Sequence, residues 1–132
     1  MECFLRSDIG LTHLPGRVIQ KAVGPDSFST STKMVVGFAY YSSGSGPMEP
    51  HHHAEETVYI INASDGWVEY GEEKAAMNHR IHLKVDMVLH IPENEWHAFR
   101  YGEKGYVHIL FIYGQSDNIR PEESPGSSIP AR

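Results

Sequence analysis

Eight short segments rich in β-branched and aromatic residues constrain the fold of this chain more than any other feature. Gly, Pro, Asn or Asp residues separate them, as is usual for strands that are joined by turns. The segments are residues 17–23, 33–41, 57–61, 67–71, 80–85, 87–91, 96–101 and 106–113. So many short strands at close spacing predict an all-β domain, either a sandwich or a barrel.

The connections between these segments are short. Residues 62–67, "NASDGW", and residues 101–106, "YGEKGY", are typical of turns between neighbouring strands. Only residues 71–78, "GEEKAAMN", have helical composition, and their length allows one or two turns of helix at best. The sequence therefore predicts very little helix.

The charge balance and the single cysteine limit the partners and the compartment that we expect. A formal net charge of −6 leaves no basic surface for nucleic acid or an anionic membrane, so we expect neither as a partner. Cys3 is the only cysteine, which excludes a disulfide framework and a cysteine-rich zinc site. No segment approaches the run of about 18 apolar residues that a membrane span requires. We expect a cytoplasmic protein.

The sequence "EPHHHAEE" at residues 49–56 points to metal chemistry. Residues two apart in a strand face the same way, so His51 and His53 would present both imidazoles with their Cα atoms about 6–7 Å apart. A carboxylate a few residues later would add a hard, charged ligand. Because imidazole and carboxylate together suit Fe, Mn, Ni, Zn or Cu better than Ca or Mg, we predict one divalent transition metal per chain. An open coordination position would remain for water or for a small-molecule ligand or substrate.

A second segment adds a candidate ligand. Residues 86–99 run from an apolar strand through a Pro-containing turn into a strand that carries His97. His97 shares a strand face with Phe99, and a histidine just after such a turn can face the interior. The alternative for His97 is an ordinary interior or surface histidine.

Together the two segments resemble the two signature motifs of the cupin superfamily, G(X)5HXH(X)3,4E(X)6G and G(X)5PX4HX3N. Residues 44–63 are similar to the first motif, with Glu56 in the glutamate position of "ETVYIINA". Residues 86–100 are similar to the second motif, where four residues separate Pro92 from His97. The resemblance implies a small single-domain cupin. Its fold would be an antiparallel double-stranded β-helix, or jelly-roll barrel, that holds a metal inside by three histidines and one glutamate.

The resemblance also suggests how the chain is organised. With the flanking strands it covers residues 33–113, which we expect to form the cupin barrel. Residues 1–32 would add an N-terminal strand and arm to the same domain. Residues 114–132 lack apolar periodicity, so we expect a polar C-terminal tail that is extended or disordered. A length of 132 residues suits this single domain.

The first motif is one residue shorter than the family pattern, because only two residues separate His53 from Glu56. Three ligand assignments therefore stay open. In the first assignment His51, His53, Glu56 and His97 all bind the metal. This requires a bulge or a tightened backbone, since strict alternation would put Glu55 on the face of the two histidines.

The other two assignments use different residues of the histidine run. In the second assignment the family spacing is kept, and Glu49 and His51 fill the paired positions of a carboxylate-rich site. In the third assignment Pro50 stands where the first histidine is expected, and only His52 and Glu56 are left of the first motif's ligands. That arrangement would weaken or abolish metal binding. His97 belongs to all three assignments.

Three further residues are candidates for the wall of a substrate pocket. Tyr40 and Phe99 would shape such a pocket if they faced the metal, although packing in the barrel core is the simpler interpretation. His108 lies inside the last apolar strand. There it would form a hydrogen bond beside the site, take part in proton transfer, or serve as an ordinary core or surface histidine.

A site of this kind supports several reactions. A carbonyl, enediol or carboxylate oxygen that binds a divalent ion is polarised for proton transfer, and Fe or Cu adds dioxygen chemistry. We therefore hypothesise a metal-dependent cupin enzyme that acts on a small oxygenated metabolite, of the isomerase, lyase or dioxygenase type. The alternative is a non-catalytic cupin that binds a small molecule or a sugar. A structural or assembly partner without metal is a third possibility.

The resemblance also implies a homodimer, since small cupins commonly dimerise. The apolar segments 17–23 and 106–113 are candidates for a shared sheet edge, because uncovered edges invite pairing.

Overall fold

The structure is a computed structural model that describes residues 1–51 and 54–114. The described part contains seven strands: β1 (Thr12–Leu14), β2 (Arg17–Val23), β3 (Val35–Ser42), β4 (Glu56–Gly71), β5 (His79–His82), β6 (Val88–Ile91) and β7 (Trp96–Tyr113). It also contains three 3₁₀ helices: η1 (Arg6–Asp8), η2 (Ser43–Ser45) and η3 (Lys74–Ala76). No helix in the described residues is long and apolar enough to cross a bilayer. The predicted C-terminal tail lies, apart from Gly114, outside the described residues.

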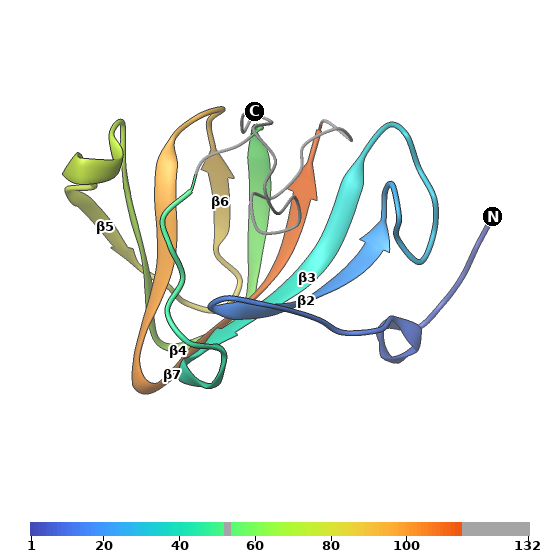
Figure 1. Cartoon of the computed structure of the whole chain (residues 1–132), viewed down its shortest axis with the longest axis horizontal. Helices are drawn as coiled ribbons and strands as arrows, with labels where there is room; N and C mark the ends of the chain where they lie inside the picture. The colour runs from blue at the N-terminus through green and yellow to red at the C-terminus, as the bar shows by residue number, and fades with distance from the viewer. Residues whose placement is uncertain (52–53, 115–132) are drawn as a thin grey trace.

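Every pairing between strands is antiparallel, in the order β1-β2-β3-β7-β4-β5, and β6 pairs with β4 beside this path. The long strands β4 and β7 belong to both halves of the fold. The first half of β4 pairs with β6 and with the second half of β7, whereas its second half pairs with β5 and with the first half of β7. Figure 1 shows both strands bending at the lower left, with β5 on one side and β2 and β3 on the other. The predicted all-β jelly-roll fold is confirmed.

The predicted turns at residues 62–67 and 101–106 are wrong. Both segments lie inside continuous strands, β4 and β7, and mark the places where these strands bend. The pairing of β4 with β7 shifts at Asp65, which has φ +48°. A Cβ on Gly66 would lie 2.5 Å from a methyl carbon of Val107, so a glycine is required at this close approach. Gly and Asp here make a bulge within a long strand rather than a reversal of the chain.

Two other predictions concern the helical segment at residues 71–78 and the sheet edge at residues 17–23 and 106–113. The helical composition of residues 71–78 gives only η3, a single 3₁₀ turn, within the limit that we expected. The prediction that β2 and β7 form an edge shared between two chains is wrong, because neither strand lies at an edge of the sheet. Strand β2 lies between β1 and β3, and β7 lies between β3 and β4. The homodimer itself stays a prediction.

Alternation along the strands decides which side chains reach the interior. In β7 the side chains of Val107, Ile109 and Phe111 are buried in the core, whereas those of His108 and Leu110 between them are only partly buried. The same odd-numbered pattern continues at Phe99, beyond the bend. The interior face of β7 therefore begins at His97 and carries one of the predicted ligands.

Candidate functional site

His97 is the first interior residue of β7 and is only 1% exposed. Its Nδ1 lies 2.9 Å from the backbone carbonyl oxygen of Glu95. A carbonyl oxygen can only accept, so Nδ1 carries the proton in the neutral ring and Nε2 is the acceptor atom. This is how histidine ligands are usually oriented in proteins, with one ring nitrogen fixed by the backbone and the other turned to the metal.

Glu56 opens β4 and is only 4% exposed. It pairs with Ile91 of β6 on one side and with Tyr113 of β7 on the other, which fixes its backbone. Its Oε1 lies 3.7 Å from Nε2 of His97. The carboxylate and the imidazole acceptor atom therefore face each other inside the barrel.

His51 joins this pair through the backbone. His51 N donates to His97 O at 3.1 Å, and His97 N donates to His51 O at 3.0 Å. Residues that exchange both hydrogen bonds carry their side chains on the same face, and the two imidazole centroids are 4.7 Å apart. Nδ1 of His51 also lies near a backbone carbonyl oxygen, that of Glu49, at 3.4 Å.

The structure shows how Glu56, rather than Glu55, reaches the face of His51. The bridge between His51 and His97 is isolated, and the strand β4 begins only at Glu56. Glu55 points outward and contacts Nε2 of His90 at 2.5 Å, with both side chains more than half exposed. Because His51 and Glu56 do not belong to one continuous strand, the strict alternation of side-chain direction does not extend from one to the other. Glu49 is exposed, and His52 and His53 lie outside the described residues.

Arg17 is a site residue that the sequence reasoning missed. It opens β2, is only 2% exposed and is the largest fully buried side chain among the residues that the structure describes. Together with His51, Glu56 and His97 it lines an interior polar cavity of about 10 Å³. That volume is close to the space of one water molecule. The one sequence feature that could have indicated a role for Arg17 was its position at the start of an apolar strand, directly after a Pro-Gly pair.

The Pro-Gly turn fixes Arg17 in place. Gly16 has φ +82°, as the third residue of a type II turn with a preceding proline requires. Gly16 N donates to Ser45 O at 2.8 Å, and a Cβ on Gly16 would lie 2.4 Å from the Cβ of Met48. The guanidinium donates from Nη1 to Pro15 O at 3.0 Å. The turn therefore packs against the loop that leads to His51.

A second and larger cavity also has His97 in its wall. Its volume is about 380 Å³, and its walls come from β4, β5, β6 and the start of β7. The wall includes Val68, Tyr70, Ile81, Leu89, Ile91, Glu95 and His97. His97 is therefore shared by a small polar cavity and a large apolar one.

The side chains at the small cavity are of the kinds that transition metals bind. Two imidazoles, each with Nδ1 beside a backbone carbonyl, and one buried carboxylate suit Fe, Mn, Ni, Zn or Cu. Within residues 1–51 and 54–114, however, no three His, Cys, Asp or Glu side chains already converge as a metal site. The described residues therefore supply fitting ligand types without a complete ligand set.

The structure brings only one of the three predicted pocket residues to this site. Phe99 is 1% exposed and lines the small cavity, 6.3 Å from His97 between ring centroids. Tyr40 and His108 are opposite each other on β3 and β7, with ring centroids 5.6 Å apart, on the outer face of the sheet. Their even-numbered positions place them away from the barrel interior, so they do not line the cavity around His97.

His108 gives a testable pH effect on this outer face. Burial, and then the positive charge of Arg6, hold the pKa of His108 below its usual value. Between the folded and unfolded pKa values the unfolded chain binds more protons. His108 therefore leaves stability unchanged above about pH 6.5 and lowers it as the pH falls through the folded pKa. In His108→Gln the free energy of unfolding should fall less between about pH 7.5 and about pH 5 than in the unchanged chain, by urea titration.

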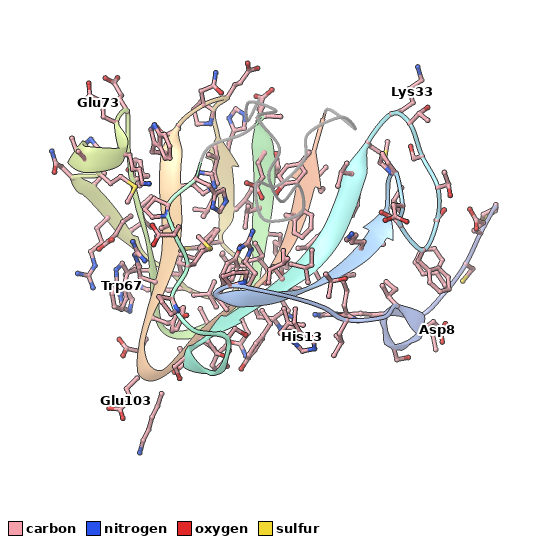
Figure 2. All side chains as sticks on the ribbon, in the orientation of Figure 1. Asp8, His13, Lys33, Trp67, Glu73 and Glu103 are labelled. Carbon is pink, nitrogen blue, oxygen red and sulfur yellow. The ribbon has the colours of Figure 1, made fainter. Side chains whose placement is uncertain are left out.

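The control for this prediction is His13→Gln. His13 is exposed on the short strand β1 (Figure 2), so its replacement should leave the pH dependence as it is. An equal pH dependence in the His108→Gln variant and the unchanged chain would contradict the prediction.

Comparison with solved structures identifies proteins of the same fold. The polyketide cyclase RemF from Streptomyces resistomycificus is similar with a TM-score of 0.68 and 17% identity, over 98% of this chain and 94% of that chain. KdgF from Halomonas sp. is similar with a TM-score of 0.61 and 13% identity, over 89% of this chain and 96% of that chain.

A third similar structure is a variant of oxalate decarboxylase from Bacillus subtilis. Its TM-score is 0.62 at 16% identity, over 91% of this chain and 31% of that chain, so this chain corresponds to less than a third of that protein. No protein-family model matches this chain, and no curated protein matches it in sequence. At these identities the similarity establishes the fold.

Proposed function

We propose that this chain, which has the cupin fold, is a metal-dependent enzyme that acts on a small oxygenated metabolite. The observation that carries the proposal is the small interior cavity between Glu56, His51 and His97. Both histidines have Nδ1 beside a backbone carbonyl oxygen, which leaves Nε2 as the acceptor atom of each neutral ring. The names of two structural neighbours, a polyketide cyclase and an oxalate decarboxylase, are those of enzymes with oxygenated substrates.

In this proposal His51, His53, Glu56 and His97 hold one divalent transition metal, Fe, Mn, Ni, Zn or Cu. Such an ion supplies a Lewis acid for a carbonyl, enediol or carboxylate oxygen, and Fe or Cu adds redox chemistry. This covers isomerase, lyase and dioxygenase reactions, and fold alone does not select one of them.

The surrounding residues orient the ligands and keep water out. The carbonyl of Glu95 holds the imidazole of His97 in one tautomer, and the backbone pairing of His51 with His97 fixes the distance between their strands. Phe99 and Tyr41, whose rings are 4.9 Å apart, close one side of the small cavity with apolar surface. A dry cavity strengthens the electrostatic effect of any charge inside it.

Elemental analysis of protein purified without a metal-affinity step tests the proposal. We expect about one transition-metal ion per chain, because two imidazoles and a buried carboxylate bind such an ion tightly. Mn, Fe, Co, Ni, Cu and Zn should all be quantified. Protein that holds none of them, before and after reconstitution with each metal, would overturn the proposal.

A non-catalytic cupin that binds a small molecule is the second candidate, and Arg17 is the observation that favours it. Arg17 lines the same small cavity as Glu56 and His97 and is 2% exposed, so the interior already contains a permanently charged side chain. A fixed cation in this place would balance the Glu56 carboxylate without a metal. Metal-free protein that is stable and binds a ligand would support this second candidate.

A further inference from the structure

The cavity of about 380 Å³ beside His97 is large enough for a substrate. Ligand pockets in proteins measure about 300–1,000 Å³ and are mostly apolar, with a few polar groups that orient the ligand. The neighbouring polar cavity, at about 10 Å³, accommodates no more than one water molecule or ion. The two cavities therefore suit different occupants, and a substrate fits only the larger one.

The position of the large cavity follows from the topology. Strands β5 and β6 each pair with β4, one with its second half and one with its first half, and no pairing between the two is present in the described residues. Figure 1 shows them on separate sides of the bent strand β4. The cavity lies between these two strands, and His97 forms part of its wall.

The chemistry of the wall is uneven. Val68, Ile81, Leu89 and Ile91 offer no side-chain hydrogen bond. At the outer rim His90 is more than half exposed and contacts Glu55, so its polar atom is already engaged with the surface. The other polar side chains of the wall are those of Tyr70 and Glu95, both partly buried, and of His97, which is 1% exposed.

We infer that the substrate of the proposed site is a small molecule with a largely apolar body and one oxygen-bearing polar end. The apolar body would lie against Ile81, Leu89 and Ile91, and the polar end would lie in the part of the cavity that Tyr70 and His97 line. A free sugar or a small dicarboxylate is a poorer fit, because most of the sugar hydroxyl groups, or the second carboxylate, would face the apolar part of the wall or the Glu95 carboxylate. This inference rests on the proposed function, since it names the substrate class of the same site.

Titration of the protein with N-phenyl-1-naphthylamine tests the inference. This neutral, apolar probe fluoresces in an apolar environment, and we expect saturable one-to-one binding to the unchanged chain. Leu89→Trp fills the cavity and should weaken binding by about tenfold or more. Ile112→Trp is the matched control, because Ile112 is exposed on the outer face of β7. This variant should bind the probe as the unchanged chain does.

A second variant tests whether weaker binding in Leu89→Trp could come from misfolding. Leu89→Asn keeps nearly the same shape but makes the wall polar, so it should weaken binding of the probe while near-ultraviolet circular dichroism stays unchanged. Glucose and oxalate are the polar comparison ligands, measured by calorimetry. Binding of glucose or oxalate without binding of the probe would overturn the inference, as would equal probe binding in Leu89→Trp and the unchanged chain.

The titration is performed on metal-containing and metal-free protein, because the probe needs no metal. A chain that holds metal but does not bind the probe contradicts the inference and leaves the proposed enzyme standing. A chain that binds the probe at Leu89 but never holds metal supports the ligand class and contradicts the proposed enzyme.

Discussion

Protein in which His97 is replaced by alanine is expected to contain less than about a tenth of the metal found in the unchanged chain. Substitution of residues that only orient a ligand already lowers metal affinity by about 10–100-fold, so loss of a ligand should cost at least as much. His97 belongs to all three ligand assignments, and its Nε2 faces Glu56 Oε1 at 3.7 Å. Metal per chain, measured by mass spectrometry after dialysis, is the readout.

The controls for His97 separate loss of a ligand from loss of the fold. His97→Asn keeps a polar side chain of smaller size in the same interior position and should also lose the metal, while circular dichroism reports whether the sheet is intact. His13→Ala removes an exposed histidine from β1 and should leave metal content unchanged. Folded His97→Ala protein with unchanged metal content would remove His97 from the ligand set.

The same measurement distinguishes the first ligand assignment from the third. If His51, His53, Glu56 and His97 are the ligands, His53→Ala should lose most of the metal and His52→Ala should keep it. Loss of metal in His52→Ala, with His53→Ala unaffected, would favour the assignment in which Pro50 stands at the first histidine position. Both substitutions lie in the same histidine run, so each serves as the control for the other.

Replacement of Arg17 by methionine is expected to lower the free energy of unfolding of metal-free protein by about 3 kcal/mol. Methionine keeps much of the apolar bulk of the side chain, so the main loss is the guanidinium charge. The Glu56 carboxylate, 4% exposed, would remain in an interior that has lost this positive charge, and Pro15 O would lose a donor. Urea denaturation measures the change.

Two further variants complete the Arg17 experiment. Lys104→Met removes an exposed positive charge at the bend of β7 and should change the free energy of unfolding by less than about 0.5 kcal/mol. Adding Glu56→Gln to Arg17→Met should recover part of the lost stability, since the two charges share one cavity. If Arg17→Met is as stable as Lys104→Met, the guanidinium does not stabilise the interior.

Much of the fold could be predicted from local patterns. Strand β2 was expected at residues 17–23 and is found at Arg17–Val23. Alternation, β-branched residues and short spacing were sufficient, because they reflect the burial of one sheet face at a time. The turns at residues 62–67 and 101–106 were wrong for a physical reason. Gly and Asp residues permit a bulge as well as a reversal, and only the partner strand decides which one forms.

The candidate site was predictable in part. The sequence pattern, with its resemblance to a known pair of motifs, singled out Glu56 and His97, and both are buried and face each other. It did not reveal Arg17, since an arginine at the start of a strand is usually exposed. Tyr40 and His108 were candidates for the pocket because they are aromatic residues in apolar strands, yet they face outward.

The sequence by itself determined the class of fold, the strands and the two segments that meet at the interior, because these follow from periodicity and residue type. Only the tertiary structure decided which side chains face inward. The break between His51 and Glu56 turns Glu55 to the surface, and the hairpin turn at Gly16 places Arg17 beside the buried carboxylate. Side-chain direction depends on cross-strand pairing and on single-residue irregularities, which shift the alternation of a whole strand without leaving a pattern in its sequence.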